Sequence, residues 1–153
     1  MRAMLCLAIT WFGLGACLDA TAAPGRIVKV LPHFLDLDGK HMLAPSLYER
    51  DAYQAHLRLH PELRSALRFD VQWKTVSPGQ YTIRLELRGR REQESTTAVL
   101  ESDRRKRGLF SNWSALPLSG DAYRKFGELT AWRATLWKGD QLVSEQKSFL
   151  WDP

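Results

Sequence analysis

Two stretches in the middle of the chain alternate apolar and polar residues with the period of a half-buried β-strand. They span residues 67–74 and 81–88, and the segment 77–80 between them has the composition of a tight turn. The alternation places one set of apolar side chains on a single face of both strands: Leu67, Phe69, Val71, Trp73, Tyr81, Ile83, Leu85 and Leu87. The pattern therefore predicts a β-hairpin with one face in the core.

Five further segments have the composition of β-strands: residues 26–35, 96–102, 109–118, 129–137 and 141–151. Pro32 cannot donate a backbone hydrogen bond, so the first strand should lie at a sheet edge or break there. The last strand lacks a consistently apolar face and should also form an edge. Seven strands, most with one apolar face, predict a mainly β chain of two stacked sheets. Their number and spacing over residues 26–151 resemble an immunoglobulin-like or fibronectin-III-like sandwich, although the Cys…Trp…Cys signature is absent.

One helix is predicted as an insertion after the first strand. Ser46 and Glu49 have the spacing of a capping box, and Pro61 should end the helix at the residue before it. Four residues fall on one stripe of this helix: Tyr48, Ala52, Ala55 and Leu59. A second, shorter helical turn is expected at residues 121–126.

The first 22 residues have the features of a secretory signal peptide. Arg2 supplies a positive charge, residues 4–18 are almost all apolar or small, and the sequence Ala-Thr-Ala at 20–22 offers a cleavage site. The apolar run is shorter than the roughly 20 residues that a spanning helix needs. We therefore expect residues 1–22 to be removed, leaving 23–153 as a single exported β-sandwich domain, periplasmic or extracellular.

The alternative is a membrane-anchored lipoprotein. Residues 14–17 (Leu-Gly-Ala-Cys) resemble a bacterial lipobox, in which Cys17 would be lipidated and become the first residue. Cys6 and Cys17 are the two cysteines of the chain, so neither cut leaves a disulfide or a thiolate metal site in the domain.

Composition and charge narrow the classes of partner. Hydrophobic residues make up 44% and charged residues 25%, as in a globular domain rather than a disordered one. The net charge of +5 permits acidic partners, but nucleic acid is not expected for an exported protein. Contact with a membrane is expected only through lipidation of Cys17.

Candidate chemistry is sparse. His56 and His60 lie four apart on the helix and form a weak candidate metal pair, because Leu57 stands where a metalloprotease has its glutamate. A third ligand would come from Glu62, His33 or His41. The sequence contains no Gly-x-Ser-x-Gly elbow and no Gly-rich phosphate loop. We expect no catalytic residue, no cofactor and no enzymatic activity.

Tryptophan supplies the candidate binding residues. Of the six in the chain, Trp73 and Trp132 fall on inward positions of their strands and should belong to the core. Trp113, Trp137 and Trp151 lie at polar or terminal positions, where they could stack on a ligand or instead seal the ends of the sandwich.

Three hypotheses follow for the function. The first is a non-enzymatic envelope module that binds another protein, as an accessory subunit of a larger assembly. The second is a carbohydrate-binding sandwich whose glycan stacks on the outward tryptophans. The third and most remote is a metal-dependent enzyme centred on His56 and His60.

Overall fold

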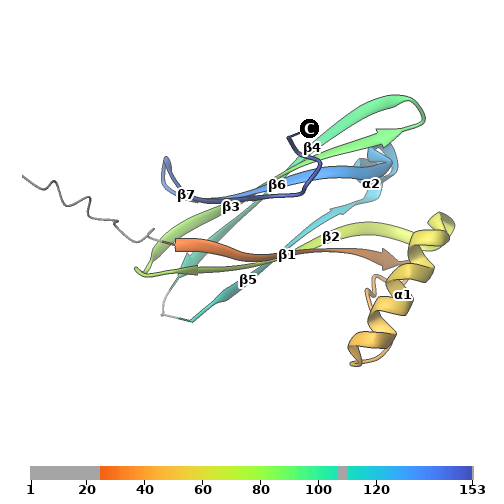
Figure 1. Ribbon diagram of the computed structural model, residues 1–153, viewed down its shortest axis with the longest axis horizontal. Coiled ribbons are helices and arrows are strands. Elements are labelled where there is room, and N and C mark those ends of the chain that lie inside the picture. Colours follow the sequence, from red (N-terminus) through yellow and green to blue (C-terminus); the bar gives the residue numbers. More distant parts are fainter. Residues whose placement is uncertain (1–24, 107–109, 153) are drawn as a thin grey trace, which may run out of the picture.

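The computed structural model describes residues 25–106 and 110–152, which fold into two antiparallel sheets (Figure 1). The first sheet has the order β1-β2-β5 and consists of β1 (Gly25–Asp36), β2 (Arg64–Thr75) and β5 (Asn112–Ser119). β1 is an edge strand, as Pro32 predicts, and its register with β2 shifts twice. The predicted mainly β, two-sheet architecture is thus confirmed.

The second sheet has the order β4-β3-β6-β7. Its strands are β3 (Gly79–Arg91), β4 (Glu94–Lys106), β6 (Glu128–Lys138) and β7 (Gln141–Lys147). β4 is longer than the alternation of residues 96–102 indicates, because all thirteen of its residues pair with β3. β7 lies at an edge, as its mixed composition predicts.

The core lies between the inward faces of the two sheets. The eight alternating apolar residues of β2 and β3 are all buried, as the alternation predicts. The predicted hairpin is wrong, however, because β2 and β3 do not pair: the segment after β2 carries the chain from the first sheet to the second, where β3 pairs with β4 and β6. Trp73 lies at its centre, with its ring centroid 5.6 Å from that of Tyr81 and its indole N–H donating to Ser114 Oγ at 3.1 Å. Trp132 is partly buried against the same cluster. Burial of these large side chains provides the main driving force for stacking the sheets.

Helix α1 (Leu47–Leu59) stands at one end of the sandwich, beside the end of β1 (Figure 1). Ser46 Oγ accepts a hydrogen bond from the Glu49 amide at 3.5 Å, and the helix ends before His60, both as predicted. A 3-10 turn (Pro61–Leu63) leads into β2. Arg64 fixes the C-terminal end of the helix by donating hydrogen bonds to the carbonyls of Leu57 and Arg58.

The face by which α1 contacts the sandwich differs from the stripe that its apolar periodicity indicates. Its buried residues are Gln54 and Leu57. The stripe itself is exposed: Tyr48, Ala52, Ala55 and Leu59. Periodicity shows which residues share a face, but contacts made elsewhere in the chain decide which face the core receives.

The C-terminal segment turns back where the sequence predicts a strand as far as residue 151. β7 ends at Lys147, and the Ser148 amide donates to the Trp132 carbonyl at 2.9 Å. The Trp151 amide then closes a turn on the Ser148 carbonyl at 3.1 Å. This turn returns Trp151 to the surface of the second sheet, where it is only 7% exposed.

A second helix, α2 (Gly120–Phe126), occupies the position predicted for a short helical turn.

Candidate binding surface

The outward face of the second sheet holds the best-defined group of polar and aromatic side chains. Strand register brings them into rows that run across β4, β3 and β6: Asp103–Thr82–Trp137, Glu101–Arg84–Thr135 and Val99–Glu86–Arg133. Residues opposite one another on neighbouring strands lie within contact distance, so each row is a chain of interacting side chains.

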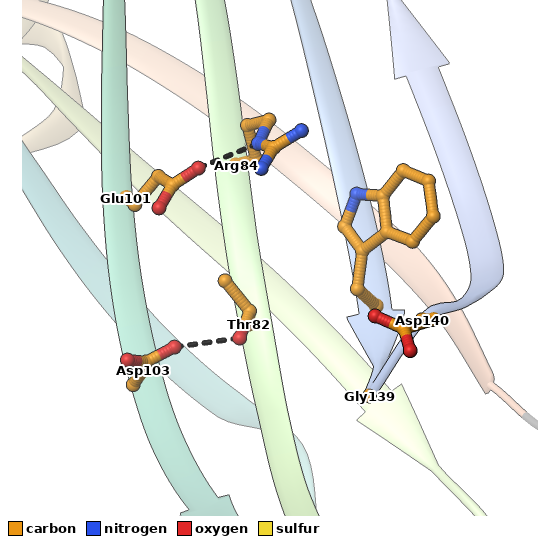
Figure 2. Close-up of a pocket in the computed structure, with 7 residues that line it drawn as sticks. Thr82, Arg84, Glu101, Asp103, Gly139 and Asp140 are labelled. Carbon is orange, nitrogen blue, oxygen red and sulfur yellow. Dashed lines mark hydrogen bonds and ion pairs between the residues drawn. The ribbon is translucent and has the colours of Figure 1, made fainter.

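The residues of the first two rows other than Thr135 line a shallow hollow of about 340 Å³, together with the turn at Gly139–Asp140. Figure 2 shows the two pairs that order it: Thr82 Oγ1 donates to Asp103 at 2.6 Å, and Arg84 Nε donates to Glu101 at 2.6 Å. The Trp137 indole N–H donates to Thr135 Oγ1 at 2.9 Å. An indole held beside carboxylates and a guanidinium offers both a stacking face and hydrogen-bonding groups.

The third row continues into an ion-pair network that covers Trp151. Arg133 binds Glu86, which lowers the pKa of the Glu86 carboxyl and raises that of Arg133. The guanidinium carbons of Arg88 and Arg133 lie 3.9 and 5.1 Å from the Trp151 ring centroid. Trp151 therefore packs on the domain and presents no free ring face for stacking.

Three of the four sheet edges are short, interrupted or covered. β1 contains Pro32 and two register shifts, and its backbone also binds the side chain of Gln54. β5 has eight residues and contains Pro117. β7 has seven residues and carries Glu145 and Lys147. These are recognised means of blocking an edge against pairing with another strand.

In its central part β4 lacks these features, except that α2 lies beside Thr96, whose Oγ1 donates to the Phe126 carbonyl. It pairs with β3 over thirteen residues without a register shift, contains no proline, and is uncharged from residue 96 to residue 100. Val99, in the middle, is 59% exposed. Its other edge pairs with no strand in the part of the chain that the structure describes. A regular edge with an uncharged central segment, here residues 96–100, can serve as a template for pairing with another polypeptide.

Trp113 lies on the first sheet, away from Trp137. It is 50% exposed and lines a second hollow with residues of β1, β2 and the segment before α1. His33 and His41 have ring centroids 5.1 Å apart there, and His33 Nε2 lies 3.6 Å from Asp70. Burial lowers the pKa of both histidines. The sequence did not lead us to predict this cluster of His33, His41 and Asp70. The feature that could have indicated it is the presence of polar residues at outward positions of β1 and β2.

His56 and His60 are adjacent, with ring centroids 4.4 Å apart, and His60 Nδ1 lies 3.1 Å from Glu62. Across residues 25–106 and 110–152, however, no three histidine, cysteine or acidic side chains are grouped as metal ligands would be. His33 and His41 lie together beside Asp70 rather than beside this pair. Of the three residues proposed as a third ligand, Glu62 therefore lies beside the His56–His60 pair, whereas His33 and His41 do not.

Two predictions concern the amino terminus. The signal peptide and the candidate lipidation site Cys17 both lie outside the described residues. Within the described residues, no helix is long and apolar enough to span a bilayer.

Comparison with known protein families, with curated proteins and with solved structures finds no match to this chain.

Proposed function

We propose that the chain is a non-enzymatic, exported module of the cell envelope that binds another protein and acts as an accessory subunit of an envelope assembly. The observation that carries this proposal is the open edge of β4, because the other edges of the described sheets are blocked. Addition of a partner's extended strand to a sheet edge is a common mode of protein recognition. It requires no catalytic group and no cofactor.

The side chains along β4 define the partner's chemistry. An added strand would lie beside Val99, which favours an apolar residue opposite it. Glu101 and Asp103 follow on the same outward face, where a basic residue of the partner would lie close to two carboxylates. The bound segment is therefore an extended strand with an apolar residue next to a basic one.

We further propose that the fold is immunoglobulin-like, of the fibronectin-III-like kind. The first, second and fifth strands form one sheet, and the third, sixth and seventh form the other, with the fourth beside the third. This division supports the assignment because immunoglobulin-type sandwiches separate strands A, B and E from strands C, F and G.

Site-specific crosslinking in cells tests the β4 site. A photoreactive residue replaces Val99 on β4 or, as a matched control, the exposed Leu142 on β7. We expect one partner to crosslink from position 99 only, and the additional substitution Thr97→Lys to abolish that product. Equal crosslinking from both positions, or none from position 99, would contradict binding along β4.

Carbohydrate binding is the second candidate, and the hollow at Trp137 favours it. Titration of envelope glycans against the tryptophan fluorescence of the purified protein provides the test. We expect a saturable signal that is lost in Trp137→Ala and retained in Trp113→Ala, because Trp113 lies on the other sheet. A response that survives Trp137→Ala would remove this candidate.

We also propose export, with a free mature chain from residue 23 or a lipoprotein anchored through Cys17. The intact mass of the protein isolated from the envelope distinguishes the two, since lipidation would retain residues 17–22 and add acyl groups. A mass equal to all 153 residues would contradict both forms.

A further inference from the structure

Helix α1 presents an apolar stripe to solvent, on the side opposite to its contact with the sandwich. Tyr48 and Leu59 lie at the two ends of the stripe and are 83% and 77% exposed. Ala52 and Ala55 lie between them and are also exposed. The small central side chains would allow another helix to approach closely, while the large ones would pack at the ends.

The segment that contains α1 carries much of the apolar surface of the described residues. Thirteen large hydrophobic side chains are exposed, and six of them come from residues 37–59: Leu37, Met42, Leu43, Leu47, Tyr48 and Leu59. Such a concentration of exposed apolar residues is typical of an interaction surface. The helix is also held firmly, since Leu57 is fully buried and Arg64 binds its last carbonyls.

The charges that border the stripe indicate what covers it. At helical spacing, Glu49 and His56 lie along one border, and Asp51 and Arg58 lie along the other. Each border thus has an acidic residue in the first half of the helix and a basic one, or one that can be protonated, in the second half. When two copies of the helix pack antiparallel, the acidic residues of one copy therefore lie near the basic or protonatable residues of the other.

We propose that α1 is the contact of a homodimer, in which two copies of the helix pack antiparallel through this stripe. A two-fold axis between residues 53 and 54 would place Tyr48 against the partner's Leu59 and Ala52 against the partner's Ala55. Like borders face each other in an isologous antiparallel pair, so Asp51 would face the partner's Arg58. Glu49 would likewise face the partner's His56. The proposal uses no residue of β4 and is independent of the proposed function.

The contact is small, so the dimer is concentration-dependent. A helix of 13 residues is about 20 Å long, and a pair of such helices buries less than the roughly 1,200 Å² of a standard stable interface. The dissociation constant of the dimer should therefore lie in the micromolar range or above.

Analytical ultracentrifugation of the purified protein, from micromolar to near-millimolar concentration, tests the proposal. We expect Ala55→Glu to raise the dimer dissociation constant at least tenfold, because it places two carboxylates at the centre of the contact. Ala122→Glu on α2 is the matched control, since it makes the same change at another exposed helical alanine and should leave the constant unchanged.

Charge exchange tests the antiparallel arrangement. Asp51→Arg and Arg58→Asp should each weaken the dimer, and the two together should restore it, because the exchanged charges again face each other across the axis. A protein that is monomeric at every concentration would overturn the proposal. So would a dimer that tolerates Ala55→Glu but is lost in Val99→Lys, which would indicate pairing through β4. Failure of the double exchange to restore dimerisation would overturn the antiparallel geometry.

Discussion

The side chain of Gln54 on α1 forms two hydrogen bonds with the backbone of Phe34 on β1, as a neighbouring strand would. The Phe34 amide donates to Gln54 Oε1 at 2.8 Å, and Gln54 Nε2 donates to the Phe34 carbonyl at 3.0 Å. The same Nε2 also donates to the carbonyl of His41 at 2.7 Å. One buried amide therefore covers part of the β1 edge and fixes the helix to the sheet.

Loss of this amide should loosen α1. In Gln54→Leu the backbone groups of Phe34 lose their partners in a part-buried site, and we expect the free energy of unfolding to fall by about 2 kcal/mol. Urea unfolding measures the loss, and hydrogen exchange should show faster exchange in α1. The exposed alanine of α2 provides the control, since Ala122→Leu should leave both quantities nearly unchanged. Equal stability of the Gln54→Leu protein would show that the contact contributes little.

Acidification should destabilise the fold through His33 and His41. Burial holds the pKa of both below its usual value, so the unfolded chain takes up protons at a higher pH than the folded chain. The free energy of unfolding should therefore decrease as the pH falls below about 6.5, the ordinary pKa of histidine. Chemical denaturation across pH 5 to 8, values chosen to bracket that pKa, measures the slope.

The substitution His33→Asn separates this effect from other titrations. Without the His33 proton site, the free energy of unfolding should depend less on pH over this range. A slope unchanged by His33→Asn would assign the pH dependence to other groups.

Two glycines should differ sharply in their tolerance of a side chain. Gly127 has φ +78°, and a Cβ there would clash with the Arg90 carbonyl oxygen. Gly139 has φ +56°, but no atom lies within 4 Å of its Cβ position. We expect Gly127→Ala to cost about 3 kcal/mol and Gly139→Ala about 1 kcal/mol, because only the first adds a clash to the backbone strain. Thermal unfolding of the two variants checks the order; similar melting temperatures would contradict it.

The alternation of β2 and β3 was sufficient to predict their core residues, because every second side chain of a strand points to the same face and a half-buried strand therefore places apolar residues at every second position. The residues near Ser46 and Pro61 likewise predicted both ends of α1, since capping and chain breaking are local effects. The orientation of α1 was not predictable in this way. It depends on Gln54 meeting the backbone of β1, a contact between side chain and strand that no apolar period contains.

The candidate surface was predictable only in part. The alternation of side chains along residues 129–137 predicted that Trp137 lies on the polar face of its strand, and in the structure it lies on that face beside Thr82 and Arg84. The open edge of β4 depends on strand order, which is set by pairing between distant parts of the chain. The environment of Trp151 depends on the turn at residues 148–151, where the sequence indicated a continuous strand.

The last residues of the chain should stabilise the fold through Trp151 alone among their apolar side chains. Its ring lies against two guanidinium groups, and Arg88 also donates to its carbonyl at 2.8 Å. Phe149 and Leu150 are 95% and 62% exposed. Deletion of residues 149–153 and the single change Trp151→Ala should therefore each lower the free energy of unfolding by about 2–4 kcal/mol, whereas Phe149→Ala should have almost no effect. Denaturant unfolding of the three variants provides the comparison. Loss of stability in Phe149→Ala would show that the exposed side chains also stabilise the fold. A truncated protein that melts at the unchanged temperature would show that Trp151 does not.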